Sequence, residues 1–307
     1  MTIRTQLKGS ACLFAAALVW GMSFSAQSNA MNYIQPYTFV FMRAAITCLI
    51  LLLTRPLFAR ISHKSGKPRE TPSLRDHIRA GALIGVFLAV ATILQQVGLV
   101  TTTPAKSGFV TALYIVIVPL LGLFMGRRVP PTVWIGLALS LVGLALLCLQ
   151  SDLSINAGDA LTLGSAFMFS CQIILVDRFA SRADVMLLNA IQAGTCAVIA
   201  GVIALIFETP NPEGIMACLG SILYVGGVSG AVGYTLQMVG QKYTAPTIAS
   251  LLMCLESVFA VLTGAVLLGE RMTGREAIGC ILMFTAVILA QLSNLGKKRK
   301  EEGTERL

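Results

Sequence analysis

One segment of this chain occurs twice, and this duplication constrains the fold more than any other feature. Residues 95–107 and 237–249 share Gln, Val, Gly, Thr and Pro at a constant offset of 142 residues (237 minus 95). Further along, residues 126–136 are echoed by residues 269–279, with the offset grown by one. If each copy holds an odd number of membrane spans, the second copy is inverted relative to the first. Inverted repeats of this kind are typical of alternating-access carriers.

Most of the chain has the composition of a polypeptide surrounded by lipid. It is 56% hydrophobic and 12% charged, whereas soluble domains carry about 25% charged residues. A membrane-spanning helix needs about 20 mostly apolar residues. Ten segments meet this requirement: 10–29, 36–54, 79–100, 105–125, 132–150, 158–177, 185–207, 214–235, 246–268 and 276–294. The predicted fold is an all-α integral membrane protein with ten transmembrane helices in two inverted five-helix repeats, residues 1–150 and residues 151–307, the second ending in a basic cytosolic tail.

The basic residues predict the direction of the spans. Cytoplasmic loops of membrane proteins are enriched in Lys and Arg. With both termini in the cytoplasm, nineteen of the 23 basic residues fall in cytoplasmic segments and three in external loops. The Arg127–Arg128 pair then lies inside and its counterpart, Glu270–Arg271, outside, as five spans per repeat require. We expect a multi-pass protein of the cell inner (plasma) membrane with cytoplasmic N- and C-termini.

The distribution of polar residues argues against other classes of protein. The net charge of +9 sits in short loops without interleaved aromatic residues, so nucleic acid is not an expected partner. The eight cysteines lie in apolar segments without CxxC spacing, which predicts neither disulfides nor a metal site. The two histidines, His63 and His77, fall in one cytoplasmic loop, which leaves none at membrane depth for catalysis or zinc binding. We expect no enzyme and no cofactor.

Polar side chains within the spans form stripes that recur in both halves. Polar groups are costly in lipid, so they face other helices or water. The stripes hold the candidate cavity and substrate-binding residues Trp20, Ser23, Gln95, Thr111, Tyr114, Phe169, Gln172, Tyr234, Gln237 and Glu256. Core packing is the alternative for the aromatic residues Trp20 and Phe169, and interhelical hydrogen bonding is the alternative for Gln95 and Gln237. Glycines of the eighth span, such as Gly230, are more typical of close helix packing.

Tyr114 and Glu256 form the most specific pair in this set. Each follows the repeated proline, Pro104 or Pro246, by ten residues, which is about 15 Å along a helix and therefore near the middle of a ~30 Å apolar core. Two inverted helices thus bring a phenol and a carboxylate to the same depth. Glu256 is the only carboxylate deep in any predicted span, so it is the candidate for proton coupling. A structural hydrogen bond or ion pair is the alternative role.

Two basic residues are candidates for charged support of the cavity. Arg43 lies on the outward half of the second span, where it either pairs with Glu256 or has a structural role. Lys106 lies near the outer mouth, where it either attracts an anion or anchors its helix at the interface.

Three segments carry a family resemblance: LVWGMSF (18–24), GFVTALYIVIVPLLG (108–122) and LESVFAVLTGAVLLGE (255–270). With their order and duplication, the chain resembles the EamA family of the drug/metabolite transporter superfamily over residues 10–294. The resemblance implies two inverted five-helix repeats around a central cavity formed chiefly by helices 1, 3, 4, 6, 8 and 9, with helices 5 and 10 at the periphery. Ser257 stands where the family often has proline, which implies a less kinked ninth helix.

The expected function is secondary transport of small organic solutes. The resemblance favours an exporter of amino acids or related metabolites that works by alternating access, and Glu256 adds proton coupling as a hypothesis. A multidrug carrier for cationic amphiphiles is the alternative within this class, and a non-transporting membrane subunit is the alternative outside it. The expected partners are a small-molecule substrate and the lipid bilayer. The sequence carries no signal for substrate identity or oligomeric state.

Overall fold

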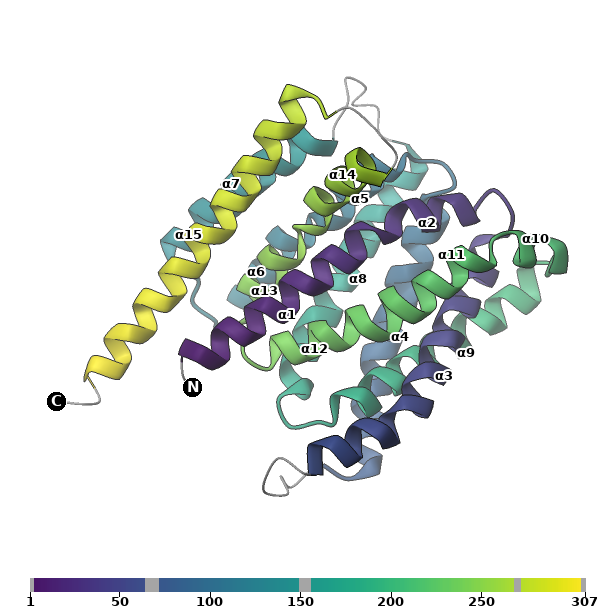
Figure 1. The fold of residues 1–307 in the computed structure, drawn as a ribbon, viewed down its shortest axis with the longest axis horizontal. Helices are drawn as coiled ribbons and strands as arrows, with labels where there is room; N and C mark the ends of the chain where they lie inside the picture. Colours follow the sequence, from purple (N-terminus) through teal and green to yellow (C-terminus); the bar gives the residue numbers. More distant parts are fainter. Residues whose placement is uncertain (1–2, 64–71, 149–155, 268–271, 305–307) are drawn as a thin grey trace.

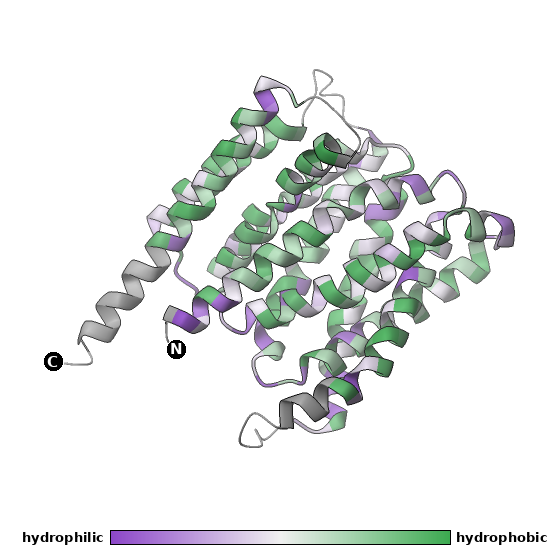
Figure 2. Ribbon diagram, viewed as in Figure 1, coloured by the Kyte–Doolittle hydropathy of each residue, from purple (hydrophilic) through white to green (hydrophobic). Residues whose placement is uncertain are grey.

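The chain folds into a bundle of long apolar helices. A computed structural model describes residues 3–63, 72–148, 156–267 and 272–304, and these residues form helices and turns without a strand. Ten stretches, here called spans 1 to 10, are long and apolar enough to cross a membrane: Arg4–Ala30, Pro36–Leu57, Leu74–Gly98, Ala105–Phe124, Pro131–Cys148, Ala157–Ala180, Val185–Phe207, Leu219–Gln241, Pro246–Thr263 and Gly274–Leu292. Hydrophobic residues cover the helices, and hydrophilic residues gather toward their ends (Figure 2). The predicted all-α membrane fold with ten spans is confirmed.

Six spans consist of one long helix, and four are interrupted. The continuous helices are α3 (Pro36–His63), α4 (Leu74–Gly98), α7 (Pro131–Cys148), α8 (Ala157–Ala180), α9 (Val185–Phe207) and α15 (Gly274–Thr304). Span 1 comprises α1 (Ile3–Gly21) and α2 (Ser23–Ala30), span 4 comprises α5 (Pro104–Ala112) and α6 (Tyr114–Phe124), and span 9 comprises α13 (Pro246–Met253) and α14 (Glu256–Leu267). Span 8 comprises α11 (Leu219–Leu223), the π-helix η1 (Tyr224–Gly233) and α12 (Tyr234–Gln241), preceded by α10 (Pro212–Ala217).

Local sequence signals set where several helices begin. Pro104 opens α5 after Thr103, whose side chain accepts a hydrogen bond from the Lys106 backbone N–H. Asn156 and Asp159 form a reciprocal capping box at the start of α8. These residue types satisfy the backbone N–H groups that a first helical turn leaves without a partner.

The span ends form two faces. We call the face that holds the start of α1 the near face, and the opposite face the far face (Figure 1). Successive spans alternate in direction, so α5 begins at the far face and α13 at the near face. The predicted loop at Glu270–Arg271 lies outside the described residues.

Helices in corresponding positions of the two halves pack against each other in opposite directions. In the pair α3 and α9, Arg55 Nε lies 2.9 Å from Asp184 Oδ2 at the near end. At the far end of the same pair, the Thr38 N–H donates to Glu208 Oε2 at 2.6 Å. In spans 4 and 9, α5 contacts α14 and α6 contacts α13. Antiparallel packing of counterparts is what an inverted repeat requires.

Two glycine contacts show the same relation in more detail. A Cβ atom on Gly98 would lie 2.8 Å from the Gly158 carbonyl oxygen, where α4 meets α8 at the far face. A Cβ atom on Gly240 would lie 2.9 Å from the Gly9 carbonyl oxygen, where α12 meets α1 at the near face. Gly98 and Gly240 are counterparts at the repeat offset of 142 (240 minus 98). Each half therefore contributes a glycine to a helix crossing that is too close for a larger side chain. The two crossings lie on opposite faces of the bundle.

Candidate functional site

Spans 1 to 4 and 6 to 9 surround a cavity at the centre of the bundle. Spans 5 and 10, formed by α7 and α15, pack on each other and contribute none of its lining residues. All ten predicted cavity residues line it: Trp20, Ser23, Gln95, Thr111, Tyr114, Phe169, Gln172, Tyr234, Gln237 and Glu256. Arg43 joins them, whereas Lys106 does not. The stripes that were separate in the sequence thus meet around one space.

The phenol and the carboxylate predicted at mid-depth are in direct contact. Tyr114 Oη donates a hydrogen bond to Glu256 Oε1 at 3.1 Å. Both side chains are buried, and Glu256 is 6% exposed. Glu256 Oε1 thus lies between the two halves of the chain, bonded to the residue at the equivalent position of the other repeat.

Each of these two residues stands directly after a break in its span. Span 4 is interrupted at Leu113 and span 9 at Cys254–Leu255, so that Tyr114 and Glu256 begin α6 and α14. At the breaks, the Leu113 N–H donates to the Val110 carbonyl, and the Leu255 N–H donates to the Leu252 carbonyl. Each of these hydrogen bonds closes a tight turn between residues three apart. Span 9 is thus interrupted although position 257 is serine and not proline.

Trp20 and Tyr234 form one aromatic wall of the cavity. Their ring centroids are 5.1 Å apart, and Trp20 Nε1 donates to the Ser229 carbonyl at 3.2 Å. A Cβ atom on Gly233 would lie 2.5 Å from Trp20 Nε1, so the indole occupies space that only a glycine leaves open. The backbone carbonyl that holds it belongs to the π-helix, a conformation frequent at functional sites.

The remaining glycines of η1 confirm the packing interpretation from the sequence. Gly226 lies against the Arg43 carbonyl and Ile46, and Gly230 lies against Thr47. Thr47 Oγ1 donates to the Gly226 carbonyl at 2.6 Å. Span 8 was expected at 214–235; it lies at Leu219–Gln241 and contains the wide π turns. Glycine-rich sequence allows this close approach to α3 but does not reveal the π geometry.

Two hydrogen bonds connect neighbouring spans in the far half of the cavity. Gln95 Nε2 donates to Thr111 Oγ1 at 3.0 Å. Arg43 Nη1 donates to Gln27 Oε1 at 2.7 Å, and the Arg43 guanidinium lies over the Phe39 ring at 5.6 Å from its centroid. Gln27 lines the cavity and was not among the predicted site residues. Its position seven residues after Trp20, on the same helical face, is the sequence signal that points to it.

A chain of amide groups connects neighbouring spans in the near half of the cavity. Gln237 donates to Gln172 at 3.2 Å, Gln172 to Gln192 at 3.5 Å, Gln192 to Asn189 at 2.8 Å and Asn189 to Thr235 at 2.9 Å. The chain starts and ends on α12 and passes through α8 and α9. The amide chain therefore connects three spans in the near half of the cavity. Asn189 was not predicted, because an isolated amide gives no indication of its partners in other spans.

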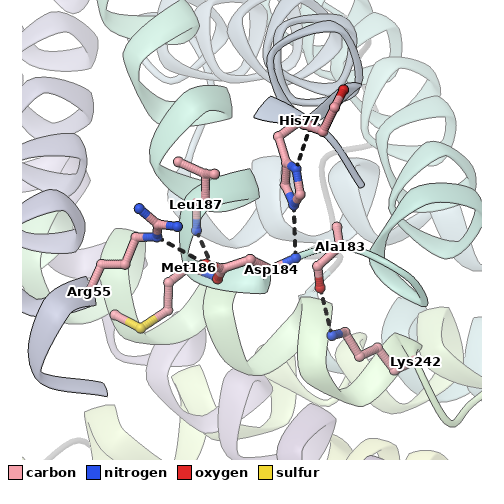
Figure 3. A network of polar contacts seen from close by, with 8 residues as sticks. Arg55, His77, Ala183, Asp184, Met186, Leu187 and Lys242 are labelled. Atoms are coloured by element: carbon pink, nitrogen blue, oxygen red, sulfur yellow. Dashed lines mark hydrogen bonds and ion pairs between the residues drawn. The ribbon is translucent and has the colours of Figure 1, made fainter. Parts of the chain in front are cut away.

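A second polar network lies at the near face and joins a different set of helices (Figure 3). Asp184 pairs with Arg55 and accepts from the Met186 and Leu187 N–H groups at 3.0 and 3.3 Å. His77 Nε2 accepts from the Asp184 N–H at 3.0 Å, and Lys242 Nζ donates to the Ala183 carbonyl at 3.0 Å. The turn before α9 is thereby joined to α3, α4 and the end of α12. Polar contacts thus connect neighbouring spans at two levels, once in the near half of the cavity and once at the near face.

Lys106 lies at the far face, outside the cavity. Its Nζ is 2.6 Å from Asp159 Oδ2, and Thr102 Oγ1 donates to Asp159 Oδ1 at 2.6 Å. These contacts join the start of span 4 to the start of span 6.

Among the residues the structure describes, no group of His, Cys, Asp and Glu side chains is arranged to hold a metal ion.

Comparisons with known proteins agree with this architecture. The EamA-like transporter family profile matches two stretches, residues 7–149 and 156–292. An uncharacterized transporter of Archaeoglobus fulgidus is 27% identical over 282 residues, which cover 91% of this chain and 84% of the relative. A solved crystal structure superposes with a TM-score of 0.72 at 18% identity, covering 92% of this chain and 96% of the other. At that identity the likeness shows the fold alone.

Proposed function

Because the chain belongs to the EamA-like transporter family, we propose that it is a secondary carrier that exports amino acids or related metabolites by alternating access. The family identifies a membrane transporter rather than an enzyme. The exporting direction and the substrate class are the proposal. The observation that carries it is the central cavity, where both halves of the chain contribute polar groups at mid-depth.

The position of the cavity supports an alternating mechanism. In its near half, the amide chain through Gln172 and Gln237 connects α8, α9 and α12, and the Asp184 network connects α3, α4 and α12 to the turn before α9. Carriers with inverted repeats bind substrate near the midplane and open one side at a time. In the proposed mechanism, these contacts form the near-side barrier.

The distribution of basic residues supports an orientation with the near face in the cytoplasm. Arg55, Arg79, Arg178 and Lys242 all lie toward the near face, at the ends of α3, α4, α8 and α12. Basic residues concentrate on the cytoplasmic side of membrane proteins. We place the near face and both termini in the cytoplasm of a cell with the protein in its plasma membrane, with residues 1–150 and 151–307 as the two repeats.

Glu256 supports proton coupling as part of the proposal. It is buried at the cavity between the two halves and is bonded to Tyr114 across the repeat boundary. A carboxyl group in this position can exchange a proton as it becomes exposed to either side in turn. A carrier for cationic amphiphiles is the second candidate. The cavity that holds the Glu256 carboxylate also holds the Trp20 and Tyr234 rings, and aromatic rings attract cations.

Counterflow in proteoliposomes tests the proposed function. Vesicles containing the purified protein are loaded with an unlabelled solute, and uptake of the same labelled solute is followed. Metabolites that accumulate in cells lacking the protein supply the candidates. A carrier gives a transient, saturable overshoot of label. Uptake that is linear in concentration and shows no overshoot with any candidate would contradict carrier function and favour a passive pore or a non-transporting subunit.

A further inference from the structure

A pocket at the near face, here called the near-face pocket, lies between the start of α4 and the end of α8. Its lining comes from both halves of the chain and includes His77, Arg79, Leu83, Arg178, Phe179 and Arg182. None of these residues lines the central cavity. The near-face pocket is therefore distinct from the proposed transport site.

The buried side of the near-face pocket is apolar and held by hydrogen bonds. Ala80 is buried, and Phe179 packs against the same hydrophobic cluster. His77 is also buried; its Nε2 accepts from the Asp184 N–H, so its Nδ1 donates to the Ser73 carbonyl, each at 3.0 Å (Figure 3). Both ring nitrogens are thus engaged within the protein. These contacts fix the turn after α8 against α4, so the pocket is formed without a ligand.

Three guanidinium groups line the exposed side of the pocket. Arg79 belongs to α4, Arg178 to the last turn of α8 and Arg182 to the turn that follows it, and all three are exposed. Arg178 lies over the Phe179 ring, 5.9 Å from its centroid. Within the described part of the chain, none of the three arginines forms an ion pair or a side-chain hydrogen bond. Their N–H donors are therefore available to a ligand.

The acidic residue of the pocket lining does not balance these charges. Asp76 lines the pocket and is within electrostatic range of Arg79. Its Oδ2 accepts from Ser73 Oγ at 2.7 Å, in the cap of α4. Three positive charges thus face one negative charge, which favours an anionic ligand.

The pocket extends from the near face into the apolar part of the bundle. Span 3 begins at Leu74, and Arg79 and Leu83 lie five and nine residues further, about 8 and 14 Å along the helix. Leu83 is 43% exposed, and so is Val86 one turn beyond it on the same face. The arginines therefore lie next to an apolar helix face that is open to lipid.

We propose that the near-face pocket binds an anionic phospholipid of the leaflet at that face. The three guanidinium groups bind its phosphate, and its acyl chains lie along Leu83 and Val86. Guanidinium groups match phosphate oxygens in geometry and charge, and basic pockets between membrane-spanning helices bind anionic lipid head groups. A topogenic role requires basic residues only on one side of the membrane and does not require them to surround one pocket.

The amphipathic lining favours a lipid over a soluble anion. A free phosphate would bind the arginines but leave the exposed Leu83 and Val86 face uncovered. A zwitterionic lipid would cover that face but would bring a positive group to a pocket that is already positive. Because α4 belongs to the first half of the chain and α8 to the second, a bound lipid joins the two halves at the near face. It should therefore stabilise the folded protein.

Matched probes test the lipid assignment. Delipidated full-length protein in detergent is titrated with dioleoylphosphatidylglycerol, with dioleoylphosphatidylcholine, which has the same acyl chains, and with glycerol 3-phosphate, which has none. Native mass spectrometry counts bound lipid, and the melting temperature is recorded at each concentration. We expect saturable binding of phosphatidylglycerol with a rise in melting temperature, binding of phosphatidylcholine about ten-fold weaker, and no change with glycerol 3-phosphate.

Arginine variants locate the site. Arg79→Gln, Arg178→Gln and Arg182→Gln should each weaken binding of phosphatidylglycerol about five-fold and leave that of phosphatidylcholine unchanged. Arg178→Lys keeps the charge and should lose less than Arg178→Gln. Arg75→Gln is the matched control, because Arg75 is an exposed arginine at the start of α4 that does not line the pocket; it should bind as the unaltered protein does. Melting temperatures without lipid show whether each variant is folded.

Three results would overturn the proposal. Equal binding of the two lipids would show that the head group is not recognised. Saturable stabilisation by glycerol 3-phosphate equal to that by phosphatidylglycerol would assign the pocket to a soluble anion. Equal losses in the three pocket variants and in Arg75→Gln would show attraction to the whole basic face rather than binding in the pocket. None of these results bears on the proposed transport function, which counterflow tests separately.

Discussion

At the scale of single residues, Glu256 combines two features that rarely occur together in a membrane span. It is a buried carboxylate, and it stands at a helix break beside the residue equivalent to it in the other repeat. A purely structural hydrogen bond would need neither the charge nor the cavity. This combination favours a role in which the carboxyl group changes its protonation or its partner during transport.

The first prediction concerns coupling. Glu256→Gln keeps a polar side chain of similar size but cannot exchange a proton, so accumulation driven by a pH gradient should be lost while counterflow persists at raised substrate concentration. Tyr114→Phe, the matched control, removes only the hydrogen bond to Glu256 and should retain gradient-driven accumulation. Both are measured with labelled substrate in vesicles with and without an imposed pH gradient. Accumulation that survives in Glu256→Gln would assign coupling to another group.

The second prediction concerns Asp184 at the near face. Asp184→Ala removes the cap of α9 and the pair with Arg55, so it should destabilise the folded protein by about 1 kcal/mol through the cap, with a small addition from the half-exposed ion pair. Asp177→Ala removes the ion pair with Arg127 but no cap, and should cost less. Thermal unfolding in detergent compares the two. An equal melting temperature for Asp184→Ala and the unaltered protein would show that the turn before α9 does not need this network.

At the scale of elements, the π-helix η1 shapes one wall of the cavity. Its wide turns direct the Ser229 carbonyl to Trp20 and the Gly226 carbonyl to Thr47. The breaks in spans 4 and 9 likewise present the first residues of α6 and α14 to the cavity. With the break between α1 and α2 in span 1, four of the spans around the cavity are irregular. This agrees with the rule that non-helical backbone at membrane depth occurs where it is buried in protein or lines a cavity.

The third prediction tests this wall. Gly233→Ala places a methyl group where Trp20 Nε1 lies, so the indole should move away from Tyr234 and transport should fall about ten-fold or more. Gly227→Ala is the matched control, because its new methyl group would meet only Ile50 at 3.4 Å, an ordinary contact. Tryptophan fluorescence reports the displacement, since the chain has two tryptophans. If both variants transport equally well, the position of Trp20 does not matter.

The sequence predicts regular elements better than irregular ones. Hydrophobic length alone located all ten spans, and the helical period identified the faces that carry Gln95, Thr111 and Phe169. The breaks before Tyr114 and Glu256 were not predicted, because neither contains proline or glycine and both depend on packing between spans. Gln192 and Asn189 were missed as members of the amide chain for a related reason. A hydrogen bond between distant spans has no local sequence signal.

At the scale of the whole molecule, the two halves have related sequences but different contacts. Gln172 and Gln237 bond to each other on the near side. Their counterparts in the other half, Ser23 and Gln95 at offsets of 149 and 142 (172 minus 23 and 237 minus 95), bond instead to other groups, Ser23 to the Trp20 carbonyl and Gln95 to Thr111. In the proposed alternating-access mechanism, the two halves exchange these arrangements, so that one side of the cavity opens as the other closes.

Cross-linking across the two barriers tests most directly whether the halves exchange their arrangements. In a cysteine-free background, Gln172→Cys with Gln237→Cys and Ser23→Cys with Gln95→Cys are each joined by a short thiol-reactive linker in proteoliposomes. We predict that both pairs cross-link, that substrate changes the two rates in opposite directions, and that either cross-link stops counterflow until the linker is cleaved. Cross-linking of the near-side pair alone, or full counterflow in either cross-linked protein, would contradict alternating access between two inverted halves.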